Sequence, residues 1–165
     1  MPLKRLPSRG KSLAFGPAPV PPPPTLPTPV SPGESLAAHE EAPDYVALVV
    51  DDDVRNVVAL TALLERRGLT VIRAESGEEA LAALKTANRI DIVFMDIMMP
   101  VMDGYEAIRA IRQTPKFAAL PIVAVTAKTA SGEEARCLAA GASSYVPKPI
   151  DTARLLLAVG EWLPR

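Results

Sequence analysis

From residue 45 onward the chain alternates between two patterns of apolar residues. Short continuous apolar runs, typical of buried strands, are separated by longer stretches in which apolar residues recur every three or four positions, as on a helix face. The runs predict strands at 45–50, 69–73, 91–95, 121–125 and 144–147, and the longer stretches predict helices at about 54–67, 76–86, 104–113, 131–141 and from 151 onward. Strands that are apolar throughout are typical of sheets covered on both faces. Five such β–α units predict an α/β fold with a doubly wound parallel sheet.

The residues between these segments are typical of helix ends. Ser76–Glu79 and Ser131–Glu134 each place Ser three residues before Glu, which predicts two capping boxes. Asp151 predicts another helix start, and Asp103 followed by Gly predicts a turn that opens a helix. Gly68 is placed to stop the first helix.

The first part of the chain differs from the rest in composition. Residues 1–43 carry 12 of the 18 prolines, and residues 17–32 are dense enough in proline to favour an extended polyproline conformation. We interpret 1–43 as a disordered proline-rich linker, although such sequence also binds proline-recognition modules. Residues 44–165 then form one domain of ordinary size.

Charge and cysteine content exclude several classes of protein. A formal net charge of −1 gives no basic field for direct nucleic acid binding. No apolar stretch approaches the roughly 20 residues of a membrane span. Cys137 is the single cysteine, so no disulfide forms within the chain, and we expect a reducing, cytoplasmic location.

Chemically active side chains follow four of the five predicted strands. Asp51–Asp53 follow the first strand, Asp96 the third, Thr126–Ala127 the fourth and Lys148 the fifth. The carboxyl ends of parallel strands meet at one edge of the sheet, where α/β proteins bind ligands. Carboxylates crowded there would repel each other, by about 4 kcal/mol for each close pair. The pattern therefore predicts a divalent cation and a phosphoryl group.

This set of residues resembles the receiver domain of two-component signalling. The resemblance is carried by Asp51-Asp52, by Asp96 within Met-Asp-Ile-Met-Met-Pro-Val-Met-Asp-Gly, by Thr126-Ala127 and by Lys148-Pro149, and it covers about 45–163. It implies a flavodoxin-like fold with strand order 2-1-3-4-5. The segment from Val50 through Glu65 is similar to receivers at the carboxyl terminus of hybrid sensor kinases.

The resemblance also implies a metal site and a phosphoacceptor. Asp96 would take a phosphoryl group from the phosphohistidine of a histidine kinase or a histidine phosphotransfer protein. Mg²⁺ would be bound directly by Asp52 and Asp96, through water by Asp51, and by the backbone carbonyl of Met98. An apolar Met98 is poor at orienting a water molecule, so we expect the phosphorylated form to hydrolyse slowly.

Four further positions complete the set that the resemblance implies. The Thr126 hydroxyl, the Ala127 backbone amide and the Lys148 ammonium would bind the phosphoryl oxygens. Thr126 and the aromatic Tyr145 would act as the switch between two packings of the last helix pair and strand 144–147. That face is also where a weak dimer would form. Lys148–Pro149 is expected to be a cis peptide.

Two other functions remain open from the sequence. A small phosphohydrolase of the haloacid-dehalogenase type also uses an aspartate after its first strand, but it needs a later acidic pair, and only Asp151 and Glu161 follow Lys148. A receiver-like module that binds partners without being phosphorylated would not need Asp96 and Lys148 together. We therefore expect a receiver without an output domain that catalyses only its own phosphorylation and dephosphorylation.

Overall fold

The computed structural model describes residues 44–128 and 130–164. The predicted proline-rich linker, residues 1–43, lies outside the described residues. In the described part of the chain, no helix is both long enough and apolar enough to span a membrane.

Five strands and five α-helices alternate along this part of the chain, as the sequence predicted. The strands are β1 (Val46–Val50), β2 (Thr70–Ala74), β3 (Ile92–Asp96), β4 (Ile122–Thr126) and β5 (Ser144–Pro147). The helices are α1 (Val54–Glu65), α2 (Gly77–Thr86), α3 (Gly104–Gln113), α4 (Glu133–Ala140) and α5 (Thr152–Trp162), with a short 3₁₀ turn, η1 (Pro115–Phe117), after α3.

All strands are parallel and lie in the order β2-β1-β3-β4-β5. The predicted fold class and strand order are confirmed. Because β5 is an edge strand, Pro147 at its end removes no backbone donor that a further strand would need. The Lys148–Pro149 peptide that follows is cis, as expected.

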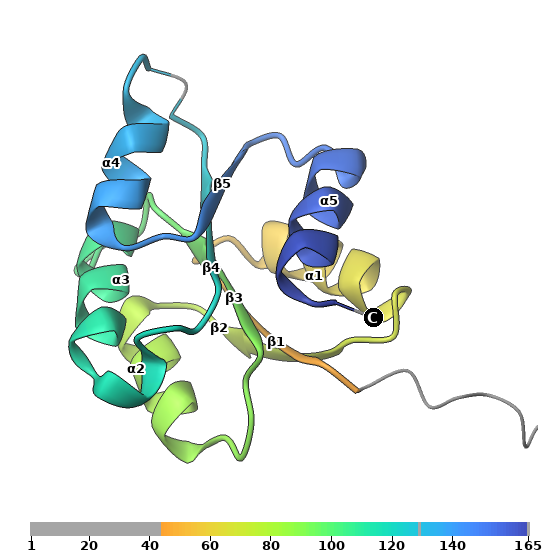
Figure 1. Ribbon diagram of the computed structural model, residues 1–165. Coiled ribbons are helices and arrows are strands. Elements are labelled where there is room, and N and C mark those ends of the chain that lie inside the picture. Colours follow the sequence, from red (N-terminus) through yellow and green to blue (C-terminus); the bar gives the residue numbers. More distant parts are fainter. Residues whose placement is uncertain (1–43, 129, 165) are drawn as a thin grey trace, which may run out of the picture. The chain divides into compact units, whose positions relative to one another are not determined.

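The helices form two layers, one on each face of the sheet. Figure 1 shows α1 and α5 on one side and α2, α3 and α4 on the other. Successive residues of a strand point to opposite faces, so Leu48 and Val50 pack under α2–α4 while Ala47 and Val49 pack under α1 and α5. The continuous apolar runs of β1, β3 and β4 thus supply both halves of the core, which explains why they do not alternate with polar residues.

Most helix ends follow the sequence, but the predicted cap of α4 is wrong. Asp103 and Glu106 form a complete capping box at α3, and Asp151 caps α5. At α4 the N-cap is Gly132 in the left-handed region, with φ 90° and no side-chain cap. The side chain of Glu133 at the first helical position is buried, so the chain turns at Gly132 and the Ser131–Glu134 box does not form.

The predicted capping box of α2 forms only in part. Ser76 caps the helix by accepting a hydrogen bond from the Glu79 amide at 3.1 Å. The Glu79 carboxylate accepts a hydrogen bond from the amide of Glu75 and not from the amide of Ser76, as a complete capping box would require. Cys137 is fully buried in α4, and burial raises the pKa of its thiol to about 11, so it behaves as a small apolar core residue.

Candidate functional site

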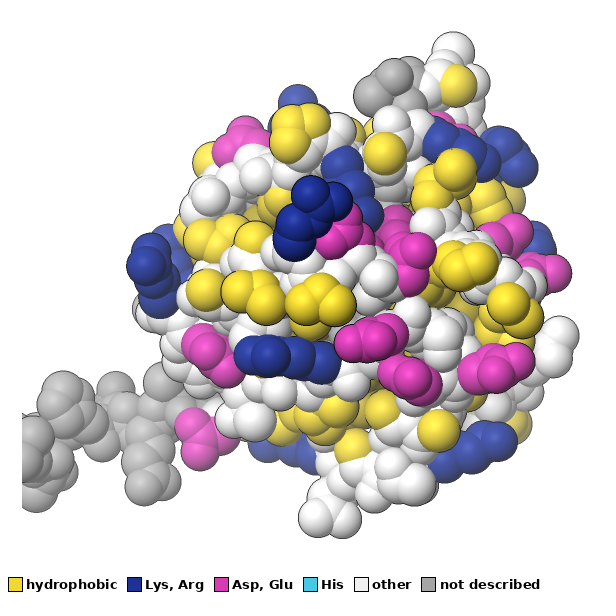
Figure 2. Space-filling model, turned by 180° about the vertical axis from the view of Figure 1, so that it is seen from behind, with side chains coloured by type: hydrophobic (Ala, Val, Ile, Leu, Met, Phe, Trp, Pro, Cys, Tyr) yellow, Lys and Arg dark blue, Asp and Glu magenta, His cyan; other side chains and the backbone are white. Residues whose placement is uncertain are grey.

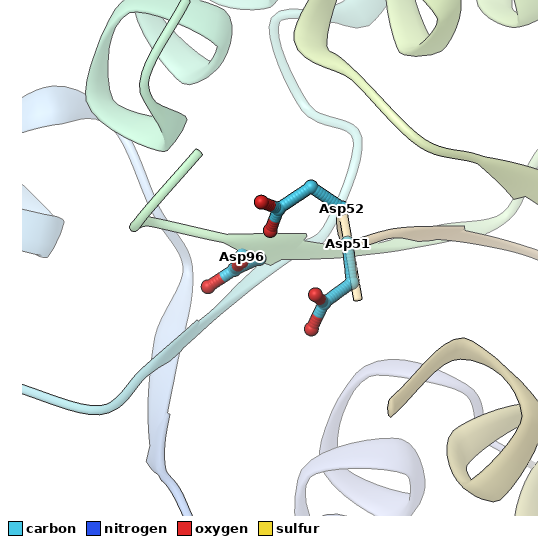
Figure 3. A group of neighbouring side chains, drawn as sticks. All are labelled: Asp51, Asp52 and Asp96. Atoms are coloured by element: carbon cyan, nitrogen blue, oxygen red, sulfur yellow. The ribbon is translucent and has the colours of Figure 1, made fainter. Parts of the chain in front are cut away.

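Three carboxylates meet at the carboxyl edge of the sheet. Asp51 and Asp52 follow β1, and Asp96 ends β3, which pairs with β1 at the centre of the sheet. One oxygen of each lies within 4.8 Å of an oxygen of the others, and Figure 3 shows all three side chains around one gap. Asp51 and Asp96 are buried, with 5% and 2% exposed, whereas Asp52 is exposed. The predicted convergence of these residues is therefore present.

Lys148 completes the cluster at the same carboxyl edge, where it follows the outer strand β5. Its ammonium nitrogen lies 2.8 Å from Asp51 Oδ2 and 3.1 Å from Asp96 Oδ1. The Lys148 backbone amide donates to the carbonyl of Thr126 at 2.8 Å, which continues the β4–β5 pairing one residue past β5. The strand pairing thus directs this side chain over the neighbouring strand ends.

Burial and charge act together on the two central groups. Desolvation, and next the charge of Asp51, raise the pKa of Asp96 from 3.8 to about 6, against the opposing effect of Lys148. Burial acts to lower the pKa of Lys148, but the hydrogen bonds and charges of both carboxylates outweigh it and hold that pKa above its usual value. Negative charge on Asp96 is therefore poorly compensated by the protein alone.

This imbalance and the donor set both fit a magnesium ion. Mg²⁺ prefers oxygen ligands and binds proteins through one or two carboxylates while keeping several waters. The buried carboxylates of Asp51 and Asp96 and the exposed carboxylate of Asp52 offer such ligands, and the exposed side leaves access for water. The residues present therefore suit this ion.

The end of β4 supplies polar groups beside the carboxylates. Thr126 is fully buried, and its hydroxyl oxygen accepts a hydrogen bond from the Lys128 amide at 3.1 Å. Ala127 is exposed in the bend that follows. Tyr145 on β5 is half-buried, and its hydroxyl lies 3.4 Å from the Lys128 carbonyl. One loop residue thus contacts both members of the predicted switch pair.

Met98 lies in the loop between β3 and α3. Its amide donates to Asp96 Oδ1 at 3.2 Å, which orients the carboxylate, and its side chain is 53% exposed. Gly104 closes the same loop, because a Cβ there would lie 2.3 Å from the Asp96 carbonyl oxygen. The close approach of α3 to β3 therefore requires glycine.

Two other acidic residues lie at helix ends and not in the cluster. Asp53 caps α1 and pairs with Arg55, whose hydrogen bonds lower the pKa of the carboxyl group. Asp103 caps α3. Both side chains therefore cap helices and lie outside the carboxylate cluster.

The acidic residues that a phosphohydrolase would require lie elsewhere. Asp151 is exposed and caps α5, and Glu161 is exposed near the end of that helix. The acidic cluster of the described residues contains only Asp51, Asp52 and Asp96. The arrangement therefore lacks the second acidic pair of the haloacid-dehalogenase alternative.

Sequence reasoning missed a buried polar pair next to the site. The Tyr105 hydroxyl on α3 donates to the carboxylate of Glu133 on α4, and both side chains are more than nine-tenths buried. The two residues are 28 positions apart, and Glu133 read as part of a surface capping box. No local pattern indicated that it points inward.

Comparison with known proteins agrees with this geometry. The sequence profile described as "Response regulator receiver domain" matches residues 47–160. Protein PilH of Pseudomonas aeruginosa is 35% identical over 112 residues, which cover 68% of this chain and 92% of PilH. The sensor histidine kinase GacS of Pseudomonas protegens is 38% identical over 122 residues, which cover 70% of this chain and 13% of the kinase. The match thus spans nearly all of one relative and a small part of the other.

Solved structures show the same fold. The chemotaxis protein CheY4 of Vibrio cholerae superposes with a TM-score of 0.68 at 31% identity, covering 73% of this chain and 99% of CheY4. A chain of the co-crystal structure of the Saccharomyces cerevisiae histidine phosphotransfer protein Ypd1 with the receiver domain of Ssk1 gives a TM-score of 0.67 at 28% identity, covering 73% of this chain and 89% of that chain. With a profile match over residues 47–160 and 35% identity to PilH over 92% of that protein, the chain belongs to the response regulator receiver domain family.

Proposed function

We propose that Asp96 is the phosphoacceptor of a two-component phosphorelay. The observation that carries this is the position of its carboxylate. Asp96 is 2% exposed, lies beside a second acid and is contacted by a lysine at the carboxyl edge of the sheet. A buried carboxylate in such surroundings is a nucleophile whose charge is incompletely neutralised until an ion and a phosphoryl group are present.

The proposed reaction moves one phosphoryl group from nitrogen to oxygen. An Asp96 carboxylate oxygen attacks the phosphorus of a donor phosphohistidine, forming a P–O bond as the P–N bond breaks. The electron pair of that bond returns to the imidazole nitrogen, which leaves as neutral imidazole after taking up a proton from solvent. Catalysis of this kind depends on positioning and on neutralising negative charge.

Asp51, Asp52, Asp96 and the backbone of Met98 would hold Mg²⁺. When bound, the ion would offset charge on the phosphoryl oxygens. Lys148 provides a compact positive charge, already 3.1 Å from Asp96. The Thr126 hydroxyl oxygen accepts from the Lys128 amide. Its own proton and the backbone amide of Ala127 would donate to phosphoryl oxygens.

Thr126 and Tyr145 form the proposed switch. Both contact the backbone of Lys128, one at its amide and one at its carbonyl. A movement of Thr126 towards a new phosphoryl group would therefore disturb the loop that holds Tyr145. This link supports a population shift of the face formed by α4, β5 and α5.

The partner is proposed to be a protein that carries phosphohistidine. Four large apolar side chains exposed in the described part of the chain flank the site: Val54 and Val58 on α1, and Met98 and Val101 after β3. A hollow of about 190 Å³ lies between α1 and residues 148–150. Figure 2 shows acidic side chains gathered beside apolar patches on one face of the domain. Such a surface suits an apolar helix that presents its histidine to the acidic pocket, and the similarity to the Ssk1 complex with Ypd1 supports this partner.

We also propose a domain organisation, a location and a weak dimer for this chain. Residues 1–43 would be a linker and 44–165 the receiver domain, in the cytoplasm. The exposed side chains of Leu138 on α4 and Leu157 on α5 support a weak dimer through the face of α4, β5 and α5. Because the chain spans only a small part of the hybrid kinases that it matches, any role inside a longer kinase is likewise proposed.

Intact-mass measurement with Mg²⁺ and acetyl phosphate tests the proposal. The wild-type protein should gain one phosphoryl group, and Asp96→Asn should gain none. Asp53→Asn is the matched control, because Asn also caps helices and this side chain lies outside the carboxylate cluster. It should be phosphorylated like the wild type. Equal labelling of the wild type and Asp96→Asn would show that another residue is modified and that the assignment is wrong.

The decay of the labelled protein tests the expected slow hydrolysis. After removal of the donor, the phosphorylated form should persist for minutes or longer, because the apolar Met98 beside the carboxylate does not orient water. A half-life of seconds would contradict that expectation without affecting the assignment of Asp96.

A further inference from the structure

Tyr105, in the first turn of α3, contacts charged groups of α4 and of the loop after β4. Its hydroxyl donates to Glu133, which is 3% exposed. Burial, and next this hydrogen bond, hold the pKa of Tyr105 well above its usual range, so it remains a donor. Arg136 lies 3.9 Å from Glu133 and 5.0 Å from the centre of the Tyr105 ring. The ring is therefore fixed at both its polar end and its face.

The same ring binds the side chain of Lys128. The ammonium nitrogen lies 5.6 Å from the ring centroid, within the range of cation–π attraction. Among the residues that the structure describes, this ammonium forms no ion pair with a carboxylate. The backbone of Lys128 thus borders the site at Thr126, whereas its ammonium lies over an aromatic ring of α3.

Lys128 is also the residue whose backbone joins the site to the proposed switch. Its amide binds the Thr126 hydroxyl and its carbonyl accepts from Tyr145. Its side chain begins next to the groups that would bind phosphoryl oxygens, and its four-carbon stem is long enough to turn either way. The position of the ammonium therefore determines how many cations face the pocket.

We propose that Tyr105 is a positioning residue for phosphorylation: anchored by Glu133, its ring holds the Lys128 ammonium against α3 and keeps it out of the phosphoryl pocket. This inference rests on the proposed function of Asp96. It explains why α3 carries a buried tyrosine hydroxyl opposite a buried carboxylate, where two apolar side chains would pack without any polar group to satisfy.

Removal of the ring should change the affinity for a phosphodonor. In Tyr105→Leu the freed ammonium can turn to the pocket and attract the anionic donor. The half-saturating concentration of acetyl phosphate should then fall at least about threefold, a Coulomb effect of one added charge near the surface, while the limiting rate changes little. Tyr105→Phe keeps the ring and should show a smaller fall.

A second substitution separates positioning from a general structural effect. In a Lys128→Met background no ammonium is present, so Tyr105→Leu should leave the half-saturating concentration unchanged. Phe117→Leu is the matched control, because it removes a similar pair, with Lys116 5.5 Å from the Phe117 ring, at η1. It should not alter the kinetics. An equal effect of Tyr105→Leu in both backgrounds would overturn the inference.

Nuclear magnetic resonance gives a readout that does not need phosphorylation. Protons next to the Lys128 ammonium should be shifted upfield by the Tyr105 ring and should return to ordinary values in Tyr105→Leu. An ordinary shift in the wild type would overturn the contact itself. If Tyr105→Leu does not fold, Tyr105→Leu/Glu133→Gln, which removes the buried carboxylate left without its partner, replaces it in every comparison.

Different results would reject the proposed function of Asp96 and the proposed role of Tyr105. If the wild-type protein shows the upfield shift of the Lys128 protons but is not labelled by acetyl phosphate, the proposed function is rejected. Labelling of Asp96 without coupling between Tyr105 and Lys128 would reject only the role of Tyr105.

Discussion

The buried carboxylate of Asp96 should make the metal-free protein less stable as the pH rises. Its pKa is raised from 3.8 to about 6, first by burial and then by Asp51. The folded state therefore binds this proton more tightly than the unfolded state. Stability falls wherever the folded state holds more protons, so the free energy of unfolding should decrease between about pH 4 and pH 6. At higher pH, the ionised Asp96 carboxylate destabilises the folded state by its full amount.

The size of this cost follows from the two pKa values. Each tenfold change in proton affinity corresponds to about 1.4 kcal/mol. A rise from 3.8 to about 6 thus costs the folded state about 3 kcal/mol when Asp96 is ionised. Lys148 remains paired with Asp51 at 2.8 Å when Asp96 is neutral, so neutralisation leaves no unpaired ammonium.

Asp96→Asn should therefore stabilise the metal-free protein at pH 8. Urea unfolding monitored by circular dichroism should show a gain of about 2–3 kcal/mol over the wild type at pH 8 and little difference at pH 4, a midpoint shift of about 1–2 M. Asp52→Asn is the control, because it removes an exposed acid of the same cluster. It should change stability by no more than about 0.5 kcal/mol.

Magnesium should remove most or all of this difference between the two proteins. An ion that binds only the folded wild type at a hundred times its dissociation constant adds about 2.7 kcal/mol, and Asp96→Asn lacks one ligand. If Asp96→Asn is no more stable than the wild type at pH 8 without metal, or if its advantage is the same at pH 4, burial of the Asp96 charge is not the source of strain. The argument for a cation at this site would then lose its physical basis.

Three further substitutions and one control test the structure around the site. Lys148→Met removes the ammonium from two buried carboxylates and should cost about 3 kcal/mol at pH 8 in urea unfolding, less at pH 4; an unchanged stability would show that the ion pairs contribute nothing. Gly104→Ala places a Cβ 2.3 Å from the backbone oxygen of Asp96 and should cost about 3 kcal/mol, whereas Gly160→Ala in α5 meets nothing within 4 Å and should be neutral or stabilising by about 0.5–1 kcal/mol in thermal melts. Val101 is a β-branched residue with φ 69°, so Val101→Gly should relieve strain and raise stability by about 1 kcal/mol; a loss would show that this turn is not strained.

The convergence of the acidic residues could be predicted from the strand pattern itself, whereas the strand order came only from the resemblance to receiver domains. A carboxylate that follows a buried strand must lie at the sheet edge, and parallel strands bring such residues together. The strand ends were less predictable. Asp96 and Thr126 were read as residues that follow strands, but both are the last residues of theirs, pairing with Val125 and Pro147. Backbone pairing does not depend on whether the side chain is polar. A strand can therefore extend one residue beyond the apolar run that predicts it.

The start of α4 was not predictable, and the reason bears on function. Ser131 and Glu134 satisfy a local capping rule, but Glu133 between them is held by the Tyr105 hydroxyl from another helix. A local cap stabilises a helix by about 1 kcal/mol. Leaving a buried carboxylate without its partner costs more than that, so the distant contact decides where the helix begins. A local rule therefore fails beside the site because a long-range polar contact takes its place, and that contact also holds the ring on which Lys128 rests.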